Sequence, residues 1–292
     1  MHVLMSPDDY CQQRAARSGS SFYYSFRFLP DERRQAITAL YAFCREVDDA
    51  VDECTDVVIA RQKLDWWRAE VDRLFAHTPT HPVTCALLVS LTRFRLAQGH
   101  FHEIINGMQM DLDYDAYPTF NELSQYCYRV ASVVGLLSAE IFGFQNSQTL
   151  RYAQDLGMAF QLTNILRDVH EDAMRGRVYI PLDELAKFGV KPEALRETRT
   201  SPAAAELFKF QAQRAREYYQ RAFKHLPIED RHTQRSGIIM AEIYLATLQE
   251  IEVDQYRVLE HRISLTPLRK LWIAWTTARR EKKQRRLNPV AA

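Results

Sequence analysis

Apolar residues with helical spacing cover almost the whole of this chain, and the segments between them are short. Patterns of this kind occupy 8–17, 31–53, 57–77, 82–98, 100–114, 119–143, 147–172, 201–225, 234–260 and 267–285. Only 9 glycines occur among the 292 residues, which suits long helices better than a fold with many turns. Because no alternating strand pattern of useful length is present, the sequence predicts an all-α protein.

No stretch rich in glycine, serine or proline divides the chain, and no internal repeat is evident. We therefore expect a single domain over residues 1–292, in which residues about 279–292 form a basic C-terminal tail. The formal net charge of +1 provides no general attraction to nucleic acid, so we expect no nucleic-acid partner.

The cysteines and the beginning of the chain are typical of a cytoplasmic protein. The five cysteines are scattered and form no CxxC pair, which argues against a zinc site or a disulfide framework. No basic segment followed by an apolar run opens the chain, so we expect no signal peptide. The longest apolar-rich stretch, 130–144, contains Ser132, Ser138 and Glu140 and is too short and polar to span a bilayer.

The segment 35–53 combines a largely apolar helix with one stripe of polar side chains. Tyr41, Arg45, Asp48 and Asp52 recur at i, i+4, i+7 and i+11, which places them within an arc of about 60° on a helix. Asp49 lies beside this stripe. Carboxylates on a buried helix must find cations or become protonated.

A second apolar segment, 152–172, repeats the arrangement. Gln161, Asn164, Asp168 and Asp172 follow at i, i+3, i+7 and i+11, within an arc of about 80° on a helix. If the two stripes face each other, they line a pocket with oxygen atoms between apolar walls. Oxygen ligands of this kind suit Mg²⁺, or Mn²⁺ in its place.

Arginines accompany the second stripe. Arg167 precedes Asp168, and the loop after the stripe reads RGRVYIP at 175–181. Arginines and metal ions around one cavity suit the oxygens of a diphosphate, a leaving group whose developing charge both can neutralise. For either stripe alone, a solvated charged face or a structural ion pair is the alternative; two matched stripes favour a shared site.

Several motifs together closely resemble the squalene/phytoene synthase family. They are Ser21-Phe22 ahead of Phe28-Leu29-Pro30, YAFCREVDDAVDE at 41–53, YCYRVA at 126–131, QLTNILRDVHED at 161–172 and RVYIP at 177–181. The resemblance extends from about residue 10 to residue 275. It implies an isoprenoid-synthase-type helical bundle around a central cavity, and a prenyltransferase that joins two prenyl diphosphates head to head with Mg²⁺.

The resemblance also implies roles for individual residues. Metal binding is implied for Asp48, Asp49, Asp52, Asp168 and Asp172, and the spacing of Asn164 adds it to this set. Substrate contacts are implied for Ser21, Phe22, Tyr41, Arg45, Gln161, Asn164, Arg167, Arg177, Tyr179, Tyr244 and Arg262. Tyr128 is assigned as the aromatic residue nearest the carbocation, although its register relative to Tyr126 and Arg129 is open. Arg45, Tyr128 and the aspartates at 48, 52, 168 and 172 form the expected catalytic set.

Within the family, the sequence of residues 20–53 is most similar to those of bacterial presqualene diphosphate synthases of hopanoid pathways. We therefore expect condensation of two farnesyl diphosphates to presqualene diphosphate, without NADPH, and a downstream squalene-pathway enzyme as a partner. A phytoene synthase that uses geranylgeranyl diphosphate is the close alternative. A terpene cyclase and a non-catalytic interaction protein are two further alternatives.

The last helical segment carries tryptophans next to a cluster of basic residues. Trp272 and Trp275 precede Arg279, Arg280, Lys282, Lys283, Arg285 and Arg286. This pattern fits peripheral contact with an anionic inner membrane, and it fits a solvated helix end equally well.

Overall fold

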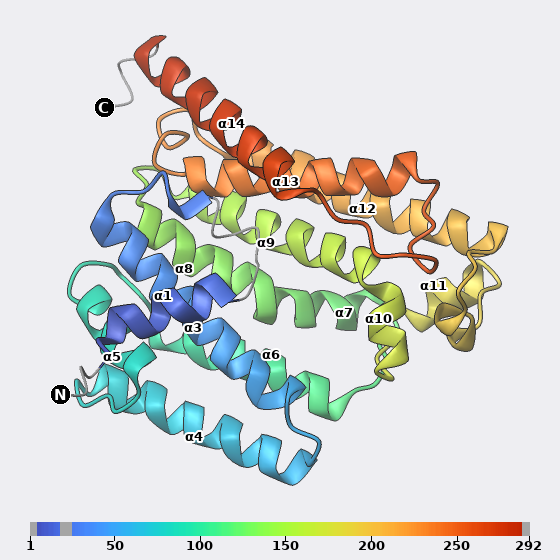
Figure 1. The fold of residues 1–292 in the computed structure, drawn as a ribbon, viewed down its shortest axis with the longest axis horizontal. Helices are drawn as coiled ribbons and strands as arrows, with labels where there is room; N and C mark the ends of the chain where they lie inside the picture. Colours follow the sequence, from blue (N-terminus) through green and yellow to red (C-terminus); the bar gives the residue numbers. More distant parts are fainter. Residues whose placement is uncertain (1–4, 18–24, 288–292) are drawn as a thin grey trace.

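The computed structural model describes residues 5–17 and 25–287, and within these ranges it contains helices and no β-strand, as the sequence predicts (Figure 1). A single isolated bridge joins Ala116 and Val178. The helices in the first half are α1 (Pro7–Arg17), α3 (Asp31–Asp52), α4 (Val57–Phe75), α5 (Pro82–Leu91), α6 (Gln98–Asp113), α7 (Phe120–Cys127), the π-helical η1 (Tyr128–Ser132) and α8 (Val133–Phe142). The second half contains α9 (Gln148–Arg167), α10 (Val169–Met174), α11 (Leu182–Lys187), the 3₁₀ segment η2 (Pro192–Arg196), α12 (Pro202–His225), α13 (Arg235–Val253) and α14 (Pro267–Leu287).

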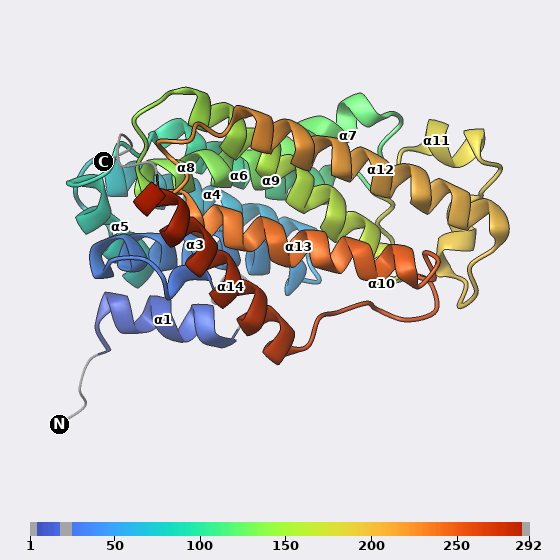
Figure 2. The same cartoon turned by 90° about the horizontal axis from the view of Figure 1, so that it is seen from above.

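Two apolar cores lie on either side of the middle of the bundle. One core joins α3 to α1, α4, α5 and α6, and the other joins α9 to α12 and α13. The segments η1 and α8 pack between them, against both α6 and α9 (Figures 1 and 2). This arrangement brings α3 and α9, which carry the two polar stripes, to opposite sides of one central space.

The second stripe does not lie on one continuous helix, contrary to the sequence expectation of a helix over 147–172. Asp168 ends α9 and precedes α10, with φ of −103° and ψ of 11°, so that Asp172 belongs to α10. The expected helix 119–143 is likewise interrupted by the π-helical turn η1. Such turns widen a helix locally and are common at functional sites.

Glycines allow the helices around the central space to approach closely. A Cβ at Gly157 of α9 would lie 2.5 Å from the carbonyl oxygen of Ala131 and 2.6 Å from Cα of Ser132. At Gly135 of α8 it would lie 2.4 Å from the carbonyl oxygen of Ala153. Because these neighbours are all backbone atoms, a larger residue must push the helices apart.

Gly157→Ala is therefore expected to lower the free energy of unfolding by about 1–3 kcal/mol, the usual cost of overpacking a core. Thermal or urea unfolding followed by circular dichroism measures this loss. Gly99→Ala is the matched control, because a Cβ at Gly99 meets nothing within 4 Å. Equal stability of both variants would contradict the close packing of α9 against η1.

Candidate active site

A pocket rich in carboxylates and arginines lies between α3 on one side and α9 and α10 on the other. Ten residues that the sequence analysis singled out line it together: Arg45, Asp48, Asp52, Gln161, Asn164, Arg167, Asp168, Asp172, Arg177 and Tyr179. We call this space the acidic pocket. The two polar stripes therefore face each other across it.

Arginines are paired with most of the carboxylates in the acidic pocket. Arg45 donates to Asp48 over 2.6 Å and Arg177 donates to Asp52 over 2.7 Å. Asp168 accepts from Arg167 and from Arg262, each over 2.8 Å. Arg45 comes from α3, Arg167 from α9, Arg177 from the loop after α10 and Arg262 from the loop before α14, so four segments supply positive charge to the pocket.

Burial and crowding of like charges make two of these carboxylates hard to ionise. Burial raises the pKa of Asp48 to about 6, although Arg45 opposes the shift. Burial, with the negative charge of Asp168 adding to it, raises the pKa of Asp172 to about 7. Burial acts in the same direction on Asp168, but hydrogen bonds from Arg167 and Arg262 hold its pKa below the usual value. The arginines present thus satisfy Asp168 and leave Asp172 in need of a further cation.

The donor set of the acidic pocket fits Mg²⁺. The side-chain oxygen of Asn164 is buried without a hydrogen-bond partner, next to the carboxylates. In the described ranges no three acidic, histidine or cysteine side chains converge closely enough to hold an ion by themselves. Mg²⁺ commonly binds through one or two carboxylates and completes its shell with water and substrate phosphates. Asp48, Asp52, Asn164, Asp168 and Asp172 are the residues that would hold it here.

Asp111, a half-buried carboxylate of α6 at the edge of the pocket, was not among the predicted site residues. Asp111 accepts hydrogen bonds from Tyr179 over 2.7 Å and from Tyr126 over 3.1 Å, and burial raises its pKa to about 6. A signal was available, because position 111 continues the i, i+4, i+7 spacing of the buried residues Ile104 and Met108. A carboxylate on the apolar face of a helix requires a partner or a function.

Tyr126, rather than Tyr128, reaches the acidic pocket. The ring of Tyr126 stacks on Tyr179 with centroids 5.1 Å apart, and its hydroxyl points to Asp111. Tyr128 lies two residues on, along a different groove that includes Glu103 and Arg129. Residues two apart on a helix point in nearly opposite directions, so only one of the two tyrosines can face the pocket.

Asp49, which the sequence also suggests as a metal ligand, is not among the residues that line the acidic pocket and lies in a separate groove with Arg14 and Glu46. Its carboxylate accepts from Arg45 over 2.8 Å and from Arg14 of α1. Arg14 also pairs with Glu46 over 2.8 Å. Asp49 faces away from α9 and ties α1 to α3, while Arg45 links this cluster to Asp48.

Asp49→Asn is expected to leave the Mg²⁺ concentration needed for half-maximal activity unchanged. It should lower the free energy of unfolding by about 1–2 kcal/mol, because two arginines lose a charged partner. Activity titrated with Mg²⁺ and urea unfolding measure the two effects. Asp48→Asn is the comparison, and a similar rise in the Mg²⁺ requirement in both variants would place Asp49 among the ligands after all.

The remaining expected residues lie around the rim and in the adjoining cavity. Tyr244 of α13 is buried, and its pKa is raised by burial, with Arg167 and a hydrogen bond from Asn164 opposing the shift. Tyr41 lies in the wall of the adjoining cavity. Arg262 reaches Asp168 from the surface. Ser21 and Phe22 lie outside the described residues.

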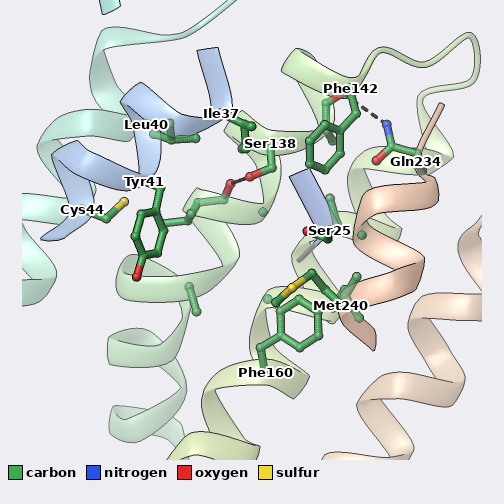
Figure 3. Close-up of a pocket in the computed structure, with 18 of the residues that line it drawn as sticks. Ser25, Ile37, Leu40, Tyr41, Cys44, Ser138, Phe142, Phe160, Gln234 and Met240 are labelled. Carbon is green, nitrogen blue, oxygen red and sulfur yellow. Dashed lines mark hydrogen bonds between the residues drawn. The ribbon is translucent and has the colours of Figure 1, made fainter. Parts of the chain in front are cut away.

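An apolar cavity adjoins the acidic pocket, and the two share Cys44, Val130, Gln161 and Asn164 in their walls. Figure 3 shows Tyr41 and Cys44 of α3 on one side of this cavity, with Phe160 and Met240 opposite. At the far end, Gln234 donates to the carbonyl oxygen of Gly143 over 3.0 Å, beside Phe142. From Asn164 to Tyr152 the cavity follows α9 for about 18 Å, at a rise of about 1.5 Å per residue. A charged head group and a long apolar tail would each find a matching environment.

Comparisons with known proteins agree with the family resemblance seen in the sequence. Residues 15–269 match the squalene/phytoene synthase family. The chain is 36% identical over 274 residues to phytoene synthase of Arthrospira platensis, with 89% of each chain covered. It is 37% identical over 260 residues to phytoene synthase of Mycobacterium bovis, covering 87% of this chain and 84% of that one. A crystal structure of a dehydrosqualene synthase superposes with a TM-score of 0.86 at 28% identity, over 95% of this chain and 97% of that one.

The family match covers most of the chain, and the helical architecture is that of an isoprenoid synthase. An acidic pocket that opens onto an apolar cavity agrees with the chemistry of the family, the head-to-head condensation of prenyl diphosphates. This chain belongs to the squalene/phytoene synthase family of prenyltransferases.

Proposed function

We propose that this chain is a phytoene synthase, which condenses two molecules of geranylgeranyl diphosphate head to head in the presence of Mg²⁺. The observation that carries the proposal is the acidic pocket continuous with a long apolar cavity. The choice of the C20 substrate rests on the relatives, since those that share 36% and 37% identity with this chain are phytoene synthases. The C15 substrate expected from the sequence is less well supported.

In this proposal the acidic pocket holds the diphosphates. Arg45, Arg167 and Arg177 surround it with fixed donors whose geometry suits phosphate oxygens. Mg²⁺ bound by the aspartates would offset the negative charge that develops on the diphosphate as its carbon–oxygen bond breaks. Cleavage of the carbon–oxygen bond in one substrate molecule releases diphosphate and leaves an allylic cation, which the allylic double bond of the second, intact molecule attacks. Loss of one proton then closes a cyclopropylcarbinyl diphosphate. Cleavage of its carbon–oxygen bond releases the second diphosphate and leaves a cyclopropylcarbinyl cation, which rearranges and loses a second proton to give the C40 hydrocarbon.

The apolar cavity in this proposal protects the cation from water. Its walls are mostly aliphatic and aromatic, with Tyr41 and Phe160 near the acidic end. Aromatic faces stabilise nearby cations, and the exclusion of water prevents premature capture. Tyr126 and Tyr179, held by Asp111, place two further aromatic rings at the pocket.

A second candidate is the condensation of two farnesyl diphosphates to presqualene diphosphate. The observation in its favour is the close superposition on a dehydrosqualene synthase, with a TM-score of 0.86. Both candidates need the same pocket chemistry and differ in the length of the tail that the cavity accepts. Neither the condensation of geranylgeranyl diphosphate to the C40 hydrocarbon nor that of farnesyl diphosphate to presqualene diphosphate is expected to require NADPH.

Incubation of the purified chain with Mg²⁺ and either substrate, without NADPH, distinguishes the candidates. A C40 hydrocarbon formed from geranylgeranyl diphosphate, at a higher kcat/KM than farnesyl diphosphate gives, supports the proposal. A phosphatase-sensitive C30 diphosphate as the main product would establish the second candidate instead. A cyclic hydrocarbon from a single substrate molecule would indicate a terpene cyclase, and no turnover of either substrate would indicate a non-catalytic protein.

A further inference from the structure

The helix α14 has one face that packs on the protein and one that does not. Ile273, Ala274 and Thr277 are buried and lie against α13. Glu281, the sole acidic residue of α14, is buried on the same side and pairs with Arg231 over 2.9 Å. The opposite face of α14 therefore carries no acidic group. In Figures 1 and 2 this helix crosses the outside of the bundle.

Large apolar side chains are exposed on the outer face of the first half of α14. Leu268 is 79% exposed, Trp272 65%, Trp275 51% and Leu271 39%. On a regular helix these four positions fall within an arc of about 100°. Four large apolar side chains exposed together, two of them tryptophans, form a contiguous patch of the kind that marks an interaction surface.

Basic residues continue the same face through the second half of α14. Arg279, Lys282, Lys283 and Arg286 are all exposed, and they project into nearly the same arc as the apolar patch. Within the described chain none of these four takes part in an ion pair. The guanidinium of Arg279 lies over the ring of Trp275, 4.5 Å from its centroid, where the two halves meet.

The apolar half of α14 lies at the end nearer the acidic pocket. Lys270 lies in the first turn of α14. Burial lowers the pKa of Lys270, and the positive charges of Arg167 and Arg262 nearby lower it further. Arg262 itself reaches into the pocket to Asp168. The loop 254–266 connects α13 to the beginning of α14 on this side (Figure 2). A surface that covers the outer face of α14 would thus lie beside the pocket rim.

We propose that the outer face of α14 docks on an anionic lipid bilayer. Tryptophan and leucine side chains enter the boundary between head groups and acyl chains, and the lysines and arginines contact the anionic head groups. In the described part of the chain no helix is both long enough and apolar enough to cross a membrane, so the contact is a peripheral one. The inference goes beyond the condensation reaction and holds for either substrate length.

A second copy of the chain is a poorer partner for this face. In a parallel pairing across a two-fold axis, the basic halves would meet and repel each other. In an antiparallel pairing, lysines and arginines would lie against tryptophans without any carboxylate to neutralise them, since α14 exposes none. A bilayer that is apolar below and anionic at its surface matches both halves at once.

Sedimentation of the 292-residue chain with vesicles tests the proposal. Vesicles of neutral phosphatidylcholine are compared with vesicles that contain about one third phosphatidylglycerol, at low salt and at high salt. Wild-type protein should bind the anionic vesicles at least tenfold more tightly than the neutral ones, and high salt should remove most of this difference. Trp272→Ser with Trp275→Ser, and Lys282→Glu with Lys283→Glu and Arg286→Glu, should each weaken binding at least tenfold.

Matched controls separate docking from damage to the fold. Ile228→Ser removes an apolar side chain that is 61% exposed elsewhere, and Lys209→Glu reverses an exposed charge on α12; both should bind like wild type. Melting temperatures and turnover in detergent micelles should stay unchanged in all of these variants. Turnover in micelles tests the condensation reaction separately, so failure of one proposal leaves the other intact.

Three results would overturn the docking proposal. One is wild-type binding that is equal on neutral and anionic vesicles. Another is unaltered binding after both sets of α14 substitutions. The third is a dimer of the chain, measured by light scattering, that dissociates in the tryptophan variant while vesicles bind neither protein.

Discussion

Asp172→Asn is expected to lower kcat/KM for the prenyl diphosphate by about 10²–10³-fold, the usual loss when one main element of charge stabilisation is removed from an active site. Asp172 lies in the acidic pocket, where burial raises its pKa to about 7, and none of the ion pairs in the described chain includes it. Its neutralisation therefore removes a carboxylate that is free to bind Mg²⁺. Steady-state kinetics over a range of Mg²⁺ concentrations measure the loss.

The fold should tolerate this change, because asparagine has the same shape and relieves repulsion from Asp168. Unfolding by urea should show stability equal to or slightly above that of wild type. Asp65→Asn is the matched control, since the side chain of Asp65 is 73% exposed and distant from the pocket. Near-wild-type kinetics in Asp172→Asn would remove Asp172 from the site.

Asp111→Asn is expected to reduce kcat by about 10²-fold, comparable to the cost of a small misplacement of catalytic groups. The carboxylate accepts from the hydroxyls of Tyr126 and Tyr179 and contributes negative charge near Arg177. An amide offers one acceptor and one donor, so one of the two tyrosines must reorient. The effect is the ratio of the variant's kcat to the wild-type kcat, both measured at saturating Mg²⁺ and substrate.

The tyrosines provide the controls for this cluster. Tyr126→Phe should also lower kcat, and its effect should be strongly non-additive with that of Asp111→Asn, because both changes break the same hydrogen bond. Tyr128→Phe should behave like wild type, since Tyr128 lies along another groove. If Tyr128→Phe is the damaging change and Tyr126→Phe is not, the placement of Tyr126 at the site is wrong.

The polar stripes were predictable because a carboxylate on an apolar helix stands out from its surroundings. Asp48 and Asp52 on α3 lie four positions apart, and this spacing alone places them on one face of the helix. Asp168 and Asp172 also reach one pocket, although α9 ends between them. The sequence pattern does not reveal this break, because Val169 and Ala173 continue the apolar spacing of the preceding helix.

The sequence could not settle the placement of residues whose direction depends on tertiary packing. Asp49 follows Asp48 directly, and which of the two faces α9 depends on where Arg14 and α1 lie. Tyr126 and Tyr128 both fit the motif, and the choice between them depends on which face of α7 and η1 packs towards α6. The helical spacing marks Asp111 as a carboxylate on an apolar face, but its partners Tyr126 and Tyr179 are 15 and 68 residues away, so its place at the site required the tertiary structure.

The length of the substrate depends on the far end of the cavity, which no local motif describes. That end combines Phe26, Phe142 and Gln234, contributed by three distant parts of the chain. Side-chain volumes there decide how long a tail fits, so small changes of residue can alter the choice between C15 and C20.

A crystal structure with Mn²⁺ and a non-hydrolysable prenyl thiodiphosphate tests the central claim, that the two polar stripes bind a metal–diphosphate cluster between them. Anomalous scattering locates the Mn²⁺ ions directly. We predict Mn²⁺ within bonding distance of Asp48 or Asp52 on α3 and of Asp168 or Asp172 across the pocket. The diphosphate should bridge the ions, and the prenyl tail should lie in the apolar cavity. Ions or analogue bound elsewhere, with these aspartates still paired only with arginines, would contradict the account.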